Sequence, residues 1–200
     1  MRRSASWRSY KPGATGAPAS APVAARRGLP VVRTVRVLGL DPGSRITGFG
    51  IIEAGSARPR YVASGAIRAG SGDFTRRLQQ IYAGVAAVVA EHRPGEIAIE
   101  RVFVHRNPDS ALKLGQARGA ALSATFGYAA ELYEYSAREV KLGVVGTGAA
   151  DKRQVQRMVS ALLGLDGTLG ADAADALAIA LCHAHGRTTR LALLAAGLGA

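Results

Sequence analysis

The order of the hydrophobic runs from Val35 onward is the feature that most constrains the fold. Three β-type runs, at 35–40, 46–54 and 60–69, are separated only by turn-forming segments. After them, strand-like and helix-like periodicities alternate along the chain. This order predicts an α/β fold, with a mixed five-stranded sheet flanked by helices and no second domain. The remaining expected strands are 96–104 and 131–136, and the expected helices are 73–93, 108–127, 137–145, 151–163 and 171–185.

The two ends of the chain lack this patterning. Residues 1–34 are rich in Ala, Pro, Gly, Ser and Arg, which predicts a disordered basic extension. Three interpretations of this extension remain open: an organellar transit peptide, a flexible basic tail, or a start codon assigned too early. We expect the folded domain to span 35–186, followed by a C-terminal tail over 187–200.

Charge and composition narrow the functional classes only modestly. The net charge is +12, but residues 1–36 hold eight of the 26 basic residues and no acidic one. The rest of the chain carries 18 basic and 14 acidic residues, so charge alone supports nucleic-acid binding weakly. No apolar run approaches the roughly 20 residues of a membrane-spanning helix. Cys182 is the only cysteine, which fits a reducing, cytoplasmic location.

Four carboxylates stand where a metal site could form. Asp41 directly follows the first strand, Glu100 lies among apolar neighbours in the fourth strand, and Asp172 and Asp175 share one face of a helix. If the first and fourth strands are parallel neighbours, their carboxyl ends bring Asp41 and Glu100 together. Crowded carboxylates repel one another unless a cation such as Mg²⁺ or Mn²⁺ binds them. Two such ions can drive phosphodiester hydrolysis.

Each carboxylate also has a structural explanation. Asp41 could be a turn or cap residue, Asp172 could be the N-cap or a first-turn residue of its helix, and Asp175 could be solvated. Glu100 is the hardest to explain in this way, because an apolar strand rarely carries an unpaired acid.

Four separated segments together resemble the RuvC family of Holliday junction resolvases over about residues 35–186. They are "GLDPGSRITGFGII", "AIERVFVHRNPDSALKLGQARGAAL", "VKLGVVGTGAADKRQVQRMV" and "ADAADALAIALCHAH". The resemblance implies a ribonuclease H-like fold, a homodimer, and Mg²⁺-dependent cutting of four-way DNA junctions, with the RuvA–RuvB branch-migration complex as a partner. It also implies that Asp41, Glu100, Asp172 and Asp175 are the catalytic acids. We expect two Mg²⁺ ions per subunit, for which Mn²⁺ can substitute.

The same resemblance suggests DNA contacts. It makes Phe103 a wedge or stacking residue at the junction, although an ordinary strand-end aromatic would look the same. Lys141 and Lys152 match basic positions that the family uses for DNA, and Lys152 could also neutralise charge on the reacting phosphate. A solvated helix face is the alternative for the basic residues. Further expected phosphate contacts are Arg106, Arg118, Arg153 and Arg157.

The function expected from the sequence is a structure-specific, Mg²⁺-dependent endonuclease. It would resolve Holliday junctions by symmetrical paired nicks during homologous recombination and DNA repair. Two alternatives remain open, a non-catalytic junction-binding module and an actin-like nucleotide-binding protein. His183 and His185 are two residues apart on one helix and do not share a face, so we expect packing or helix-end roles for them.

Overall fold

A five-stranded mixed sheet forms the centre of the protein. The computed structural model describes residues 33–55, 58–70, 72–101 and 107–198. The strand order is β3-β2-β1-β4-β5; β1 to β3 form an antiparallel meander, and β4 and β5 run parallel to β1. The predicted mixed sheet is therefore confirmed. The strands are β1 (Val35–Asp41), β2 (Ile46–Ala54), β3 (Arg60–Arg68), β4 (Glu96–Glu100) and β5 (Glu131–Tyr135).

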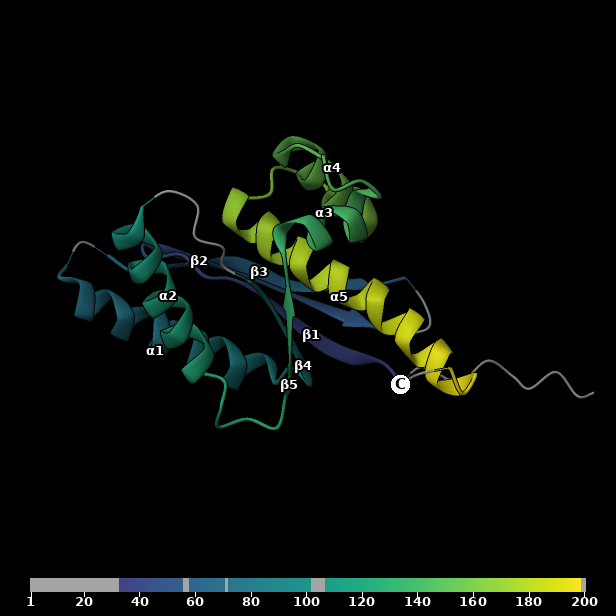
Figure 1. Ribbon diagram of the computed structural model, residues 1–200, viewed down its shortest axis with the longest axis horizontal. Helices are drawn as coiled ribbons and strands as arrows, with labels where there is room; N and C mark the ends of the chain where they lie inside the picture. The colour runs from purple at the N-terminus through teal and green to yellow at the C-terminus, as the bar shows by residue number, and fades with distance from the viewer. Residues whose placement is uncertain (1–32, 56–57, 71, 102–106, 199–200) are drawn as a thin grey trace, which may run out of the picture.

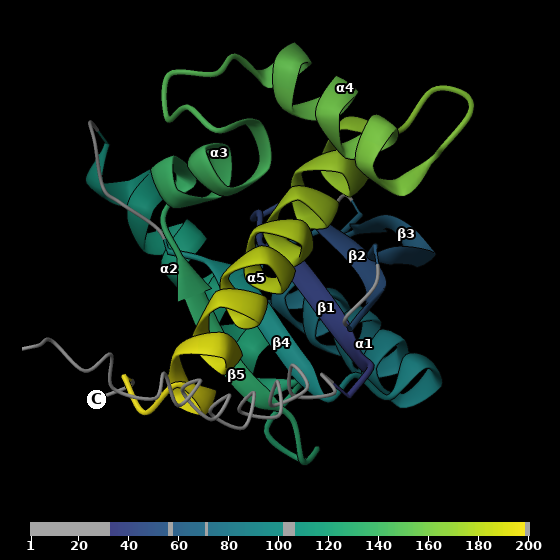
Figure 2. The ribbon, with the colours of Figure 1, turned by 90° about the vertical axis from the view of Figure 1, so that its right-hand side faces the viewer.

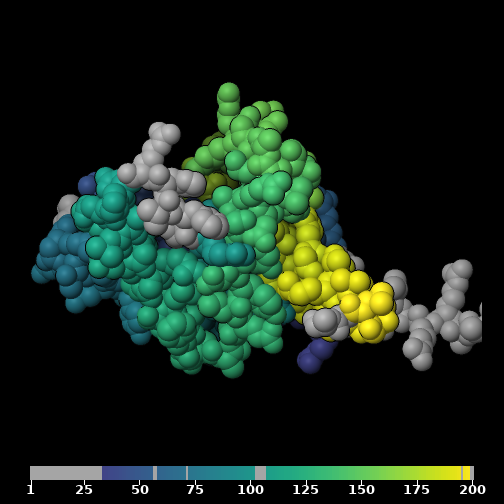
Figure 3. Space-filling view, in the orientation of Figure 1, coloured from purple at the N-terminus to yellow at the C-terminus, as the bar shows by residue number. Residues whose placement is uncertain are grey.

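Helices cover both faces of this sheet, as Figures 1 and 2 show. On one face lie α1 (Phe74–His92) and α2 (Pro108–Ser123), whose apolar residues pack with the sheet in one core. On the other face α5 (Ala171–Ala195) crosses the strands, and α3 (Ala137–Val145) and α4 (Lys152–Leu163) pack against it. In the space-filling view the lobe formed by α3 and α4 rises above the body of the molecule, facing α2 (Figure 3).

The alternation of side chains along β1 assigns each residue to one of the two cores. Leu38 and Leu40 are fully buried on the face that carries α1 and α2, whereas Val37 packs in the core beneath α5. Because neighbouring residues of a strand point to opposite faces, Asp41 lies on the same face as Val37. On β4, Ala98 packs beneath α5, so Glu96 and Glu100 also lie on that face.

The first half of α5 lies directly against the sheet because two glycines leave room for its backbone. A Cβ atom on Gly39 would lie 2.1 Å from the carbonyl oxygen of Ala176, and one on Gly48 would lie 2.1 Å from the carbonyl oxygen of Asp172. Any side chain at either position would push the helix away from the sheet. These contacts set the height of α5 above β1 and β2.

Several predicted boundaries need correction. The helix expected over 108–127 ends at Ser123, where the Thr125 hydroxyl donates to the Leu122 carbonyl and the chain turns. The strand expected over 96–104 ends at Glu100, and residues 102–106 lie outside the described residues. The last helix does not end near residue 185 but continues to Ala195, because Gly186 does not interrupt it and the strong helix formers of 190–195 follow.

The predictions for residues 1–32 and 199–200 also lie outside the described residues. Among the helices that the structure describes, none combines the length and apolar character needed to cross a membrane.

Candidate active site

The pairing of β1 with β4 places two carboxylates next to each other. The two strands are parallel, and their register pairs Leu40 with Ile99. The next residue on each strand is an acid, Asp41 on β1 and Glu100 on β4, and both lie on the face covered by α5. The predicted meeting of these acids at the carboxyl ends of parallel strands is therefore what the register produces.

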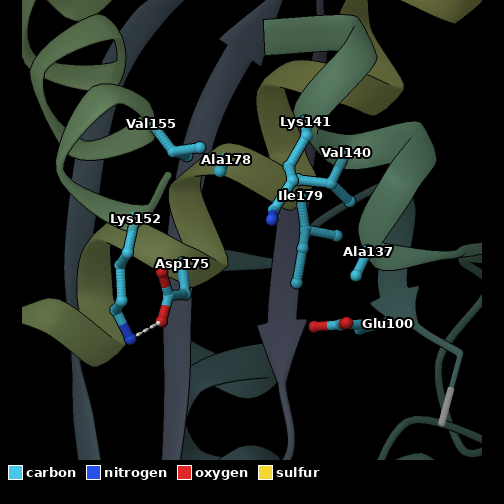
Figure 4. A pocket seen from close by; sticks show the side chains of 9 residues that line it. All are labelled: Glu100, Ala137, Val140, Lys141, Lys152, Val155, Asp175, Ala178 and Ile179. Atoms are coloured by element: carbon cyan, nitrogen blue, oxygen red, sulfur yellow. Dashed lines mark hydrogen bonds and ion pairs between the residues drawn. The ribbon is translucent and has the colours of Figure 1, made fainter. Parts of the chain in front are cut away.

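The first turns of α5 bring Asp172 and Asp175 to the same edge. The helix begins after Gly170, so Gly170 and not Asp172 is the N-cap, and Asp172 lies in the first turn. A carboxylate there is favoured by the helix dipole. The contact between the Asp172 carbonyl and Gly48 holds this turn against β2. Asp175 lines a pocket together with Glu100 of β4, as Figure 4 shows.

The electrostatics of the two strand acids show that the carboxylates influence one another. Burial, then repulsion from Asp175 and Asp172, raises the pKa of Asp41 to about 6, although Lys152 partly opposes the shift. Burial and repulsion from Asp41 and Asp175 raise the pKa of Glu100 to about 7. Near neutral pH the cluster therefore holds negative charge that the protein only partly compensates.

Two lysines face this cluster from the helices above it. The Lys152 ammonium, at the start of α4, donates to Asp175 Oδ2 over 2.6 Å. Lys141 of α3 points into the same pocket, a space of about 270 Å³ that Glu100 and Asp175 also line (Figure 4). Both predicted DNA-contacting lysines thus stand beside the carboxylates, where their positive charges could bind a phosphate group.

The donor set fits a hard divalent cation in its chemistry. All four groups offer carboxylate oxygens, which Mg²⁺ and Mn²⁺ prefer. Within the described residues, however, no three potential ligands stand close enough together to enclose an ion. Metal binding at Asp41, Glu100, Asp172 and Asp175 would therefore need carboxylate rotations and separation of the 2.6 Å pair between Lys152 and Asp175.

A family model for "Crossover junction endodeoxyribonuclease RuvC" matches residues 37–183 of this chain, a span that contains all four acids. The chain belongs to the RuvC family. RuvC of Chromohalobacter salexigens is 56% identical over 154 residues, covering 77% of this chain and 83% of that protein. RuvC of Marinobacter nauticus is 59% identical over 149 residues, covering 74% of this chain and 85% of that protein.

The folds agree as well. T. thermophilus RuvC in complex with a Holliday junction substrate matches with a TM-score of 0.72 and 34% identity, covering 78% of this chain and 96% of that one. The yeast mitochondrial Holliday junction resolvase Ydc2 matches with a TM-score of 0.58 at 12% identity, covering 84% of this chain and 88% of that one, which shows a shared fold. The ribonuclease H-like fold expected from the sequence is thereby confirmed, and membership of the RuvC family disfavours an actin-like nucleotide-binding protein.

The other predicted DNA-contacting residues of this RuvC chain differ in their surroundings. Arg153 and Arg157 are exposed on α4. Arg118 is largely occupied by protein groups, because it donates to the Glu100 carbonyl over 3.2 Å and forms an ion pair with Glu134 over 2.5 Å. Arg118 thus braces the end of β4 against β5. Phe103 and Arg106 lie outside the described residues.

Glu96, which was not among the predicted site residues, forms the most enclosed ionic contacts in the described part of this RuvC chain. Glu96 accepts from Arg187 over 2.8 Å and lies 2.6 Å from the Nε2 atom of His183. His183 is fully buried, so its predicted packing role is confirmed, whereas His185 is exposed and its Nδ1 atom contacts the Gly143 carbonyl. The available signal was an acid at the start of an apolar strand, four residues before Glu100.

Proposed function

We propose that this RuvC chain resolves Holliday junctions as a Mg²⁺-dependent endonuclease whose metal ligands are Asp41, Glu100, Asp172 and Asp175. The observation that carries the proposal is that acids from β1, β4 and α5 meet at one edge of the sheet, where burial and their mutual repulsion raise the pKa of Asp41 to about 6 and that of Glu100 to about 7. Such crowding is unfavourable unless cations bind. Asp41 would be the acid that the ions have in common, since Asp172 and Asp175 both repel it and it repels Glu100.

The protein groups around the acids would perform the remaining work. When bound, two Mg²⁺ ions, or Mn²⁺ in their place, would supply an activated water and stabilise the leaving oxygen of the phosphodiester. Lys152 and Lys141 would bind the phosphate, and Lys152 would stabilise the negative charge that develops on it. The product ends would be a 5′-phosphate and a 3′-hydroxyl, which a ligase can rejoin.

We further propose that the remaining basic side chains hold the DNA arms. Arg153 and Arg157 are one turn apart and exposed on α4, so they extend the basic surface that begins at Lys152. For Arg118, a phosphate contact would compete with its contacts to Glu100 and Glu134. Roles for Phe103 as a wedge and Arg106 as a phosphate contact remain predictions from the sequence.

Paired cutting implies a two-fold assembly. A four-way junction offers symmetry-related scissile phosphates, whereas each chain carries a single cluster of the four acids, so two nicks need two copies. The exposed side of α2 offers a surface for the second copy, since Leu112 is 62% exposed beside Gly115 in a shallow depression. We accordingly propose a homodimer that acts in recombination and repair in the cytoplasm, where buried Cys182 stays reduced, with RuvA–RuvB as its branch-migration partner.

A synthetic four-way junction tests the function directly. With Mg²⁺, we expect symmetrical paired nicks in the junction and little cutting of a linear duplex of the same sequence, and EDTA should abolish cutting. Binding of the junction without cutting in either Mg²⁺ or Mn²⁺ would instead identify a non-catalytic junction-binding module. Cutting that persists in EDTA would refute the metal assignment.

A further inference from the structure

A buried polar network joins α5 to β4 and β5. It consists of Glu96 on β4, Tyr135 on β5, and His183 and Arg187 on α5; this set is called the α5 clamp below. The Tyr135 hydroxyl lies 2.7 Å from His183 Nδ1, His183 Nε2 lies 2.6 Å from Glu96 Oε2, and Arg187 Nε donates to Glu96 Oε1 over 2.8 Å. Three elements distant in the sequence are thus held together by directional bonds.

The charges and hydrogen bonds of the clamp are mutually satisfied. Burial lowers the pKa of His183, which favours the neutral ring. In a neutral ring the Tyr135 hydroxyl donates to Nδ1, and Nε2–H donates to Glu96. Hydrogen bonds from Arg187 and His183 outweigh the effect of burial and hold the pKa of Glu96 below its usual value. The side chains of Glu96 and Arg187 are only 12% and 13% exposed, so their geometry is well constrained.

The contact between Glu96 and His183 lies at the start of β4, whereas Tyr135 is the β5 residue that pairs with Glu100 at its end. Glu96 and Glu100 lie on the same face of β4 and are about 13 Å apart along an extended strand. His183 follows Asp175 on α5 by about two helical turns, or about 12 Å. Since His183 and Asp175 belong to one continuous helix, and Glu96 and Glu100 to one strand, fixing His183 against Glu96 also restricts where Asp175 stands relative to Glu100.

We infer that Glu96, His183, Arg187 and Tyr135 are positioning residues for the metal site: the α5 clamp sets the separation between the acid of β4 and the acids of α5. This inference rests on the proposed function, because it assigns the clamp a role in metal binding by that same cluster. Mg²⁺ requires near-ideal octahedral geometry, so a small sliding of α5 along the sheet would weaken its binding. Substitution of a residue that orients metal ligands without binding the metal commonly lowers metal affinity or activity by about 10- to 100-fold.

The test measures junction cleavage by full-length Glu96→Gln protein over a range of Mg²⁺ and Mn²⁺ concentrations. We expect junction binding in EDTA at the wild-type affinity, together with an approximately tenfold higher Mg²⁺ concentration for half-maximal cleavage. Mn²⁺, which tolerates less regular coordination, should recover most of the lost rate. Tyr135→Phe removes only a hydroxyl and should shift the Mg²⁺ requirement in the same direction by a smaller factor.

Glu53→Gln is the matched control. Glu53 pairs with Arg36 and Arg60 on the opposite face of the sheet, and neither α5 nor β4 takes part in these ion pairs. This variant should keep the wild-type Mg²⁺ requirement even if its thermal stability falls.

The outcomes separate the two proposals. An unchanged Mg²⁺ requirement in Glu96→Gln, or equal losses with both metals accompanied by weaker junction binding, would overturn the positioning role. If Glu96→Gln does not fold, Tyr135→Phe decides, and an unshifted Mg²⁺ requirement in that variant overturns the inference. Failure of the wild-type protein to cut the junction in either metal would instead overturn the proposed function, and the inference with it.

Discussion

At one end of the contact between α5 and β4, Glu96 is held by Arg187 and His183, whereas at the other end Glu100 faces Asp41 and Asp175. The surroundings lower the pKa of Glu96 and raise that of Glu100 to about 7. Both acids lie on the same face of one five-residue strand. The difference shows that this protein can neutralise a carboxylate in this layer with its own groups, and that the cluster around Glu100 is left with excess negative charge.

The largest expected effect is that of Asp175→Asn, which removes a negative charge from the cluster around Glu100. We expect junction cleavage to fall by about 1,000-fold or more, because a metal ligand is lost, while junction affinity stays near that of the wild type. Gel-based cleavage and binding assays on one four-way junction measure both quantities. Asp166→Asn, at an exposed acid in the loop before α5, is the control and should cut normally. Near-normal cutting by Asp175→Asn would remove this residue from the metal site.

Removing the charge of Glu96, at the compensated end, should destabilise the folded protein. Glu96→Gln leaves the Arg187 charge without its partner, so we expect the free energy of unfolding to fall by about 3 kcal/mol at pH 7. Because the pKa of Glu96 is lowered in the folded state, its ionised form stabilises the protein at pH values above its usual pKa of 4.5. This contribution is lost as the pH falls through the lowered pKa of the folded state. Urea unfolding at pH 7 and at pH 3 measures the difference. An equal loss at both pH values would show that the charge is not responsible.

Asp41→Asn should stabilise the metal-free protein. Ionising Asp41 in the folded state is unfavourable, so neutralising it should raise the free energy of unfolding by about 2 kcal/mol in EDTA at pH 8. The gain should shrink as the pH falls through about 6, the raised pKa of Asp41, and vanish below its usual pKa of 3.8, where Asp41 is protonated in both the folded and the unfolded protein. Thermal unfolding with Mg²⁺ provides the complementary measurement, since Mg²⁺ should stabilise the wild type more than the variant. A destabilised variant in EDTA would contradict the repulsion.

The smallest expected effect is a pH dependence of the metal requirement. Cleavage at low Mg²⁺ should rise as the pH passes through 6 and 7, because the ion binds Asp41 and Glu100 in their ionised forms, whose pKa values are about 6 and about 7. Saturating Mg²⁺ should displace protons and move this rise to lower pH. Rate profiles at two Mg²⁺ concentrations test the coupling. Superimposable profiles would mean that these carboxyls do not exchange protons for metal.

The sequence predicted the existence of the strands, and the meeting of Asp41 with Glu100, because the signals for both are local. The run "VRVLGL" ends at the turn-forming "DPGS". Glu100 stands out because it follows the apolar residues Ile97 to Ile99 of its strand. The clamp was missed because Glu96 has no nearby partner in the chain, and the side chains that hold it come from β5 and α5. The length of α5 was underestimated because Gly186 does not interrupt it.

By itself, the sequence determined the order of the elements and the face on which each strand residue lies, since both follow from periodicities of two and 3.6 residues. Only the tertiary structure decided which charges would be compensated. That outcome depends on the register pairing Leu40 with Ile99 and on the close approach of α5 to Gly39 and Gly48. Electrostatic energies depend on distances between groups far apart in the chain, which packing sets and local periodicity does not.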